Sequence, residues 1–157
     1  MKRSPRIPVV FWRVIKVLNK LILSQNKPRS KAASRVLVLT TIGRNSGQPR
    51  SIPLQFEELE GVYYVASARG TQADWYRNII ACPKVEVVVG EKMFSTIARP
   101  MTDITQIADF LELRLQRHPH FMGVMLRIEG LPRKYSRSDI EKFSERLAIV
   151  ELQQPNP

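Results

Sequence analysis

The sequence contains very little cysteine and histidine. Among its 157 residues there are one cysteine, Cys82, and two histidines, His118 and His120. A single cysteine excludes an intramolecular disulfide framework. One cysteine and two histidines also provide few ligands for a zinc site, so we expect no metal centre. A chain without disulfides suits a reducing compartment, and we expect a cytoplasmic protein.

Long apolar runs are also missing. No stretch approaches the roughly 18 uncharged apolar residues that a transmembrane helix needs. The N-terminus lacks a small-residue cleavage pattern after a separate apolar block, so we expect no cleaved leader. Hydrophobic residues still make up 43% of the 157-residue chain. This length and composition predict one compact domain with its own core and one functional site.

Acidic residues are absent from the first third of the chain. Residues 1–50 contain twelve Lys or Arg and no Asp or Glu, and the first acid is Glu57. The remaining 13 basic and 14 acidic residues nearly cancel, so the formal net charge of +11 resides at this end. Such a positive field indicates an anionic partner, which leaves coenzyme phosphate, lipid head groups and nucleic acid open. Aromatic and basic residues are not interleaved and no nucleic-acid motif occurs, so we expect no nucleic-acid partner.

The spacing of residues 9–24 predicts an amphipathic helix. Its apolar face holds Val10, Val14, Val17, Leu18, Leu21 and Ile22, and its opposite face holds Arg13, Lys16, Lys20 and Ser24. Such a helix packs on the core of the domain or lies on an anionic membrane surface, here the inner face, and the sequence leaves both open. We divide the chain into residues 1–34, a basic helix with its linker, and residues 35–157, the domain that carries the site.

From residue 35 onward, short β-branched and aromatic runs alternate with turn residues. The runs cover residues 35–41, 51–57, 61–67, 84–89, 92–99 and 147–152. Strands in such quick succession predict an antiparallel Greek-key or meander barrel, because parallel pairing needs a longer crossover. Helices are predicted over 73–82 and 104–117, and a third is predicted to open with a capping box of Ser138 and Glu141. The fold class is therefore mainly β with peripheral helices (α+β).

The segment from Leu39 to Arg50 is the most informative motif. A strand runs into a turn with Gly43 and Gly47, and the turn carries Arg44, Ser46 and Arg50. Glycines let backbone N–H groups approach an anion, and guanidinium groups match phosphate or carboxylate oxygens. The segment lacks both the Gly-Lys-Ser/Thr ending of a Walker loop and the spacing of a dinucleotide fingerprint. On its own, it fits either an anion site or a polar hairpin loop.

Four ordered motifs resemble one known family. They read Thr40-Thr-Ile-Gly-Arg-Asn-Ser-Gly-Gln-Pro-Arg50, Tyr64-Val-Ala-Ser67, Trp75-Tyr-Arg-Asn78 and Cys82-Pro-Lys-Val-Glu-Val-Val-Val-Gly90. In this order and spacing they are similar to the deazaflavin-dependent nitroreductase family of split-barrel oxidoreductases, over about residues 35–100. Four motifs in order make a chance match much less probable than one would.

The resemblance implies a split β-barrel, related to FMN-binding proteins, that uses a reduced deazaflavin (coenzyme F420) as hydride donor. It also implies which residues bind that coenzyme. The phosphate and acidic tail would lie on Arg44, Asn45, Ser46 and Arg50. The ring and its linker would lie along Pro53, Leu54, Ala66, Ser67, Ala68, Arg69 and Gly70. The groove would be closed by Trp75, Tyr76 and Asn78.

The chain departs from the family pattern at two places. Many relatives have a lysine where this chain has Asn45, and we expect Arg69 to supply part of the missing charge. Relatives that activate nitro-drugs carry tyrosines in a late helical segment, whereas residues 118–127 here contain none. The resemblance names no catalytic side chain. We consider Tyr76, His118, His120 and Tyr135 as candidate proton donors.

Three functions from different classes remain open. The first is a deazaflavin-dependent reductase of a small hydrophobic conjugated molecule such as a quinone, enone or nitro compound. The second keeps the barrel but binds FMN, since a phosphate site serves either coenzyme. The third is a basic membrane-surface binding protein without redox chemistry. For the reductase, we expect the first helix, Trp75, Tyr76 and residues 118–125 to form the wall that selects the substrate.

Overall fold

The structure is a computed structural model, and it describes residues 36–67 and 69–155. The predicted helix over residues 9–24, its linker and Ala68 lie outside the described residues. The elements follow in this order: β1 (Val36–Ile42), β2 (Pro49–Leu59), β3 (Val62–Ser67), η1 (Gly70–Gln72), α2 (Asp74–Ala81), β4 (Lys84–Val89), β5 (Lys92–Ile97), β6 (Arg99–Pro100), α3 (Ile104–Arg117), α4 (Pro119–Ile128), α5 (Arg137–Ser144) and β7 (Ala148–Gln153).

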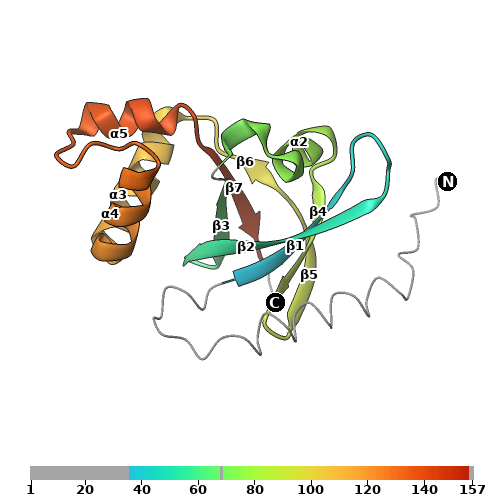
Figure 1. Cartoon of the computed structure of the whole chain (residues 1–157). Helices are drawn as coiled ribbons and strands as arrows, with labels where there is room; N and C mark the ends of the chain where they lie inside the picture. The colour runs from blue at the N-terminus through green and yellow to red at the C-terminus, as the bar shows by residue number, and fades with distance from the viewer. Residues whose placement is uncertain (1–35, 68, 156–157) are drawn as a thin grey trace. The chain divides into compact units, whose positions relative to one another are not determined.

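The strands form one curled antiparallel sheet of seven strands in the order β5-β4-β1-β2-β3-β7-β6 (Figure 1). β1 is buried along most of its length because it lies between β2 and β4 and its residues are apolar or Thr on both faces. β3 instead buries alternate residues, as a strand with one solvated face does. The prediction of a mainly β, antiparallel split barrel with peripheral helices is confirmed.

β2 is the longest strand and connects the two halves of the barrel. Its first part, from Pro49 to Gln55, pairs with β1, and its last part, from Phe56 to Leu59, pairs with β3. The strand therefore changes partner between Gln55 and Phe56, which is how the sheet curls around a single core. That core contains Leu37, Leu39, Val65, Val85, Val87, Val150 and Leu152.

α2 packs against β1 and ends where the sequence predicts. Trp75 and Ile79 lie on its buried face and belong to the barrel core. Its last residue, Ala81, is followed by Cys82 and Pro83, and proline cannot continue a helix. The predicted helix over residues 73–82 thus differs from α2 by only one residue at each end.

α3, α4 and α5 form a layer at one side of the sheet, with a second core between them (Figure 1). α3 has the predicted bounds, and Asp103 caps it by accepting hydrogen bonds from the backbone N–H groups of Thr105 and Gln106. Ile107 and Phe110 of α3 pack on Ile149 of β7, which joins this layer to the sheet. No helix among residues 36–67 and 69–155 has the length and apolar character needed to cross a membrane.

The capping box of the last helix is not where the sequence analysis placed it. The structure forms it from Ser136 and Asp139, whose side chains each bond the other residue's backbone N–H group. The prediction of Ser138 and Glu141 was therefore wrong. The same four-residue spacing occurs twice in this segment, and the tertiary contacts decide between them. Arg137 forms ion pairs with Asp109 and Glu112 of α3, and these contacts set where α5 begins.

Candidate active site

The β1–β2 hairpin forms a closed turn that presents its arginines on one side. Gly43 N–H donates to the carbonyl of Gln48 at 2.8 Å, and Gly47 N–H donates to the carbonyl of Gly43 at 2.7 Å. Gly47 has a φ of +66°, which non-glycine residues rarely adopt. The Ser46 hydroxyl accepts a hydrogen bond from the N–H of Gln48 at 3.3 Å. The turn is thus held by its own backbone.

Asn78 on α2 fixes the position of Arg44. Its buried side-chain oxygen accepts from the backbone N–H of Arg44 and from its Nη1, both at 3.1 Å, and its Nδ2 donates to the Thr41 hydroxyl at 3.1 Å. Arg44 Nη2 also pairs with the Asp74 carboxylate at 3.0 Å. These three hydrogen bonds of the buried Asn78 amide hold the Arg44 guanidinium in position before any ligand binds.

These groups line a pocket of about 450 Å³, which we call the arginine pocket. Its wall consists of Thr41, Gly43, Arg44, Asn45, Ser46, Arg50, Ser51, Ile52, Asp74, Trp75 and Asn78. Two guanidinium groups, two serine hydroxyls and a glycine turn are the donor set that phosphate and carboxylate groups need. The arginine pocket therefore suits an anionic ligand.

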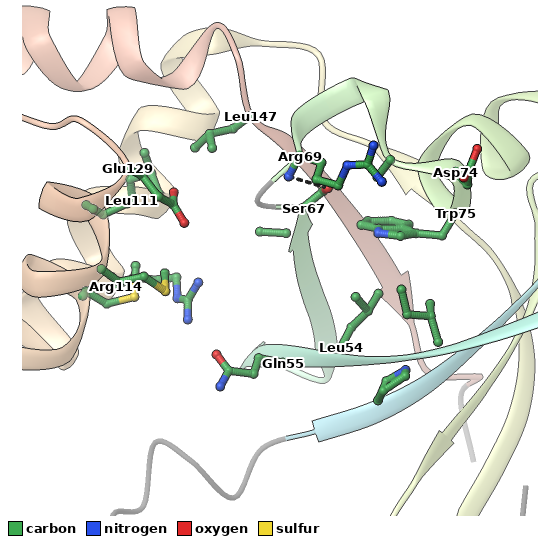
Figure 2. A pocket seen from close by; sticks show the side chains of 17 residues that line it. Leu54, Gln55, Ser67, Arg69, Asp74, Trp75, Leu111, Arg114, Glu129 and Leu147 are labelled. Carbon is green, nitrogen blue, oxygen red and sulfur yellow. Dashed lines mark hydrogen bonds between the residues drawn. The ribbon is translucent and has the colours of Figure 1, made fainter. Parts of the chain in front are cut away.

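A second cavity, of about 470 Å³, lies between the barrel and the helical layer, and we call it the apolar cavity. On the barrel side it is lined by Ile52, Pro53, Leu54, Gln55, Ala66, Ser67, Arg69, Ala73, Asp74 and Trp75. On the helical side it is lined by Leu111, Arg114, Met122, Met125, Leu126, Glu129 and Leu147. Figure 2 shows these two sets facing each other across an open space. Its size and mainly apolar wall suit a small aromatic molecule.

The two cavities are neighbours. Ile52, Asp74 and Trp75 line both of them. Trp75 is 7% exposed, and its ring centroid lies 6.1 Å from that of Tyr76 at an edge-on angle, so its position is fixed by packing. An anionic group in the arginine pocket and an apolar ring system in the apolar cavity would therefore both lie next to Trp75.

A buried ion cluster anchors the helical side of the apolar cavity. The side chain of Glu57 on β2 is 4% exposed, and its carboxylate lies 3.1 Å from Arg117 Nη1, 3.3 Å from His118 Nε2 and 3.7 Å from Arg114 Nε. All three partners lie at the C-terminal end of α3. Burial lowers the pKa of the Arg114 guanidinium and Glu57 opposes that shift. The guanidinium still carries its charge, because arginine is not deprotonated in proteins.

The structure brings most of the predicted coenzyme residues together. Arg44, Asn45, Ser46, Arg50 and Asn78 line the arginine pocket. Pro53, Leu54, Ala66, Ser67 and Arg69 line the apolar cavity, and Trp75 lines both. Arg69 thus lines the apolar cavity, whereas Asn45, whose missing charge Arg69 is expected to supply in part, lines the neighbouring arginine pocket. Ala68 lies outside the described residues.

Two of the predicted coenzyme residues line neither cavity. Tyr76 packs partly buried against the barrel core. Gly70 is buried, and a Cβ built there would lie 2.1 Å from the carbonyl oxygen of Arg146, so this glycine allows a close approach of two backbone segments. In this structure, Tyr76 therefore packs on the core and Gly70 shapes the loop after β3.

The remaining candidate proton donors also line neither cavity. His118 belongs to the Glu57 cluster, His120 is exposed, and the Tyr135 side chain lies on the surface with an exposed fraction of 44%. Among residues 36–67 and 69–155, no three His, Cys, Asp or Glu side chains gather as a metal site would require.

Sequence reasoning missed several lining residues. Gln55, Asp74, Leu111, Arg114 and Glu129 were not singled out. Of these, Gln55 and Asp74 carry a local signal, because Gln55 follows Leu54 and Asp74 precedes the Trp75-Tyr-Arg-Asn78 motif. Leu111, Arg114 and Glu129 come from segments distant in sequence. The predicted contribution of residues 118–125 to the wall does appear, through Met122 and Met125 of α4.

Comparison with known proteins identifies the family. The sequence model of the F420H(2)-dependent quinone reductase family matches residues 25–126, about two thirds of the chain. The chain belongs to this family. The resemblance to deazaflavin-dependent split-barrel oxidoreductases is thereby confirmed. Proteins of this family are described as F420H(2)-dependent quinone reductases, so the family implies coenzyme F420, a deazaflavin, as cofactor.

Curated relatives of the same family match over a shorter stretch. The F420H(2)-dependent quinone reductase of Mycobacterium tuberculosis H37Rv is 33% identical over 76 residues, which are 46% of this chain and 51% of that protein. The chain therefore spans about half the length of the curated relatives it matches.

Solved structures share the fold. The heme storage protein HutZ of Vibrio cholerae is similar with a TM-score of 0.54 at 13% identity, over 92% of this chain and 90% of that one. A conserved hypothetical protein of Mycobacterium tuberculosis is similar with a TM-score of 0.51 at 14% identity, over 99% and 87% of the two chains. Such low identities speak for the split-barrel fold alone.

The residues present fit the cofactor that the family implies. Coenzyme F420 carries a phosphate, an acidic tail and a flat ring system. The arginine pocket supplies donors for the anionic part, and the apolar cavity next to it supplies a mainly apolar wall for the ring. Asn78 already holds the Arg44 guanidinium in place, so binding an anion there does not require ordering a free side chain.

Proposed function

We propose that this chain is an oxidoreductase that transfers a hydride from reduced coenzyme F420 to a small hydrophobic conjugated molecule, such as a quinone, enone or nitro compound. One observation carries the proposal: the arginine pocket and the apolar cavity share Ile52, Asp74 and Trp75 and so lie next to each other. Family membership favours the deazaflavin over FMN. An apolar cavity next to the arginine pocket also favours an enzyme over a binding protein that has only a basic surface.

In this proposal, each group of residues has a defined role. When bound, the reduced coenzyme supplies the hydride. Arg44, Arg50 and the Ser46 hydroxyl hold its phosphate and acidic tail, and Asn78 keeps the turn in place. Pro53, Leu54, Ala66 and Ser67 contact the ring and its linker. The apolar residues of α3 and α4 exclude water and hold the acceptor against the ring, so that orientation lowers the barrier.

The function is tested by titration followed by rapid mixing. Absorbance titration is expected to show saturable binding of coenzyme F420 and much weaker binding of FMN. The complex with reduced F420, mixed with menadione under air in a stopped-flow instrument, should reduce the quinone in a two-electron step and consume little oxygen. Rapid oxygen consumption without the quinone would indicate FMN chemistry. Failure to reduce any quinone, enone or nitro compound in a panel would refute the reductase.

The arginine pocket is tested by two single substitutions. Arg44→Ala and Arg50→Ala should each weaken coenzyme F420 binding by about 1.5–3 kcal/mol, the usual range for hydrogen bonds to charged groups. Isothermal titration measures the change. Arg77→Ala is the matched control, because Arg77 is also an exposed arginine next to the site, on α2, but lines neither cavity. Equal affinities in all three variants would remove the phosphate assignment.

We also propose that residues 1–34 bring the protein to the inner face of an anionic membrane. Support comes from the sequence, where this segment is basic and contains no acid. Replacing Arg13, Lys16 and Lys20 by glutamate in the full chain should abolish co-sedimentation with vesicles that contain anionic lipid. Vesicles of neutral lipid should bind neither protein. Undiminished co-sedimentation of the triple variant would contradict the proposal.

A further inference from the structure

Arg114 is the cationic group that the helical layer contributes to the wall of the apolar cavity. It lies on α3, one turn after Leu111, and its side chain is 12% exposed. Figure 2 shows the guanidinium directed from α3 into the space between the helices and the strands. A cation at this place is costly to desolvate, so its presence in a mainly apolar wall calls for a partner.

The partners within the protein leave Arg114 incompletely satisfied. Glu57 lies 3.7 Å from its Nε, and the buried Nε makes no hydrogen bond. The same carboxylate lies closer to Arg117 and to His118, at 3.1 and 3.3 Å. The Phe110 ring centroid lies 5.9 Å from Arg114 Cζ, which adds a weak cation–π contact. Among the described residues, Glu57 is the one carboxylate that pairs with Arg114.

The charges around the cavity do not neutralise this guanidinium. Glu57 is shared between two arginines, so the cluster keeps an excess of positive charge on the side of the cavity. Glu129 also lines the cavity, but its carboxylate does not come within the 4.0 Å of an ion pair with Arg114. Asp74 lies on the barrel side and pairs with Arg44. Arg114 therefore presents unused N–H donors to whatever occupies the cavity.

Resting on the function proposed above, we propose that Arg114 binds a carbonyl oxygen of the acceptor and stabilises the negative charge that forms there. Hydride addition gives a quinone two electrons and one hydrogen, while the coenzyme loses the same. One acceptor oxygen is then anionic until a proton from water neutralises it and completes the hydroquinone. A guanidinium in a mainly apolar wall stabilises that oxygen more than it stabilises the neutral carbonyl, so it raises the rate.

The proposal also assigns an acceptor class. A molecule that fits has a flat apolar ring for the wall of Leu111, Met122, Met125 and Leu126 and a carbonyl or nitro oxygen at the edge that faces α3. Acceptors without such an oxygen gain nothing from Arg114. Quinones and enones therefore rank above purely hydrocarbon ring systems of the same size.

The test compares Arg114→Gln, Arg114→Lys and the control Arg117→Gln in the full chain. Arg117 pairs with the same Glu57 and lies on the same helix, but it does not line the cavity. With menadione and reduced F420, Arg114→Gln should lower kcat by about 100-fold, as loss of one oxyanion donor does. Arg114→Lys should recover much of that loss. Arg117→Gln should stay within about threefold of the parent, as expected of a partly exposed pair.

A binding measurement separates contact from structural support. Each protein, free of coenzyme, is titrated with 2-naphthoate, a flat ring that carries an anionic oxygen, and with neutral 2-methylnaphthalene. Arg114→Gln should bind naphthoate at least tenfold more weakly than the parent and bind methylnaphthalene equally well. Equal behaviour of Arg114→Gln and Arg117→Gln in both assays would overturn the proposal. A loss of F420 affinity in Arg114→Gln as large as its loss of naphthoate affinity would also overturn the proposal, because Arg114 would then contact the coenzyme.

The two proposals can fail separately. If the parent protein reduces no quinone, but Arg114→Gln selectively weakens naphthoate binding, the reductase function fails and the anion-binding role of Arg114 stands. If the parent reduces quinones and Arg114→Gln does so at the same rate, the reductase stands and the role of Arg114 fails. Thermal unfolding of each variant confirms that the compared proteins are folded.

Discussion

Replacing Glu57 by glutamine is expected to lower the free energy of unfolding by about 2–4 kcal/mol, because breaking a buried ion cluster leaves charges without a partner. The side chain of Glu57 is 4% exposed and has three cationic or histidine partners at the end of α3. Arg117 is 44% exposed and regains water, which keeps the loss below that of a fully buried pair. Urea denaturation followed by circular dichroism measures the change.

Glu58→Gln is the matched control for Glu57. Glu58 is the next residue on β2 and its side chain is exposed, so its replacement should change the free energy of unfolding by less than about 0.5 kcal/mol. Similar losses for the two variants would show that the cluster does not stabilise the fold.

Since Glu57 connects β2 to α3, replacing Glu57 by glutamine should also loosen the helical side of the apolar cavity and raise KM for the acceptor.

Gly70→Ala is expected to lower the free energy of unfolding by about 2–5 kcal/mol, through left-handed backbone strain added to steric overlap. Gly70 has a φ of +56°, and a Cβ there would lie 2.1 Å from the carbonyl oxygen of Arg146. The Arg146 oxygen belongs to the backbone and the backbone fixes the position of the Cβ, so neither atom can turn away. The segment before β7 would have to move from the loop that follows β3.

Gly90→Ala separates the two contributions to that loss. Its φ is +57°, nearly the same as that of Gly70, but a Cβ there would meet nothing within 4 Å. The Gly90 variant should therefore lose only the cost of the left-handed backbone, about 1–2 kcal/mol. If urea denaturation gives the same loss for both glycines, the close approach to Arg146 does not matter for stability.

The barrel could be predicted because its signals are local. β1 and β4 are short apolar runs bounded by turn residues, and the hairpin between β1 and β2 has glycines where the turn closes. The bounds of α3 follow from its apolar spacing and its Asp103 cap. Each of these features lies within one short continuous stretch of the chain, so a single sequence is sufficient.

The helical side of the site could not be predicted in this way. Glu57 and Arg117 are 60 residues apart, and nothing near either residue marks it as half of an ion pair. Glu57 reads as the polar residue of an ordinary strand, and Arg114 reads as part of the solvated face of α3. Only the packing of α3 against β2 buries Glu57 among its cationic partners and places Arg114 in the cavity wall.

The arginine motif lies between these two cases. Arg44, Ser46 and Arg50 could be chosen from the sequence because the glycines and arginines are adjacent in one turn. The role of Asn78 came with the resemblance, but its physical reason appears only in the structure, where its amide joins Arg44 to Thr41. The choice between Ser136 and Ser138 as helix cap likewise depended on contacts between α5 and α3.

The wall of the apolar cavity is divided between two groups of elements that can vary independently. α4 contributes Met122, Met125 and Leu126 to the apolar cavity and nothing to the arginine pocket. Trp75 and Ile52 contribute to both, so a change at either affects coenzyme and acceptor together. Met122 and Leu126 are also buried in the core of the helical layer, whereas Met125 is only partly buried. Selection for a new acceptor is therefore least constrained at Met125, where substitutions should change substrate range while leaving cofactor use intact.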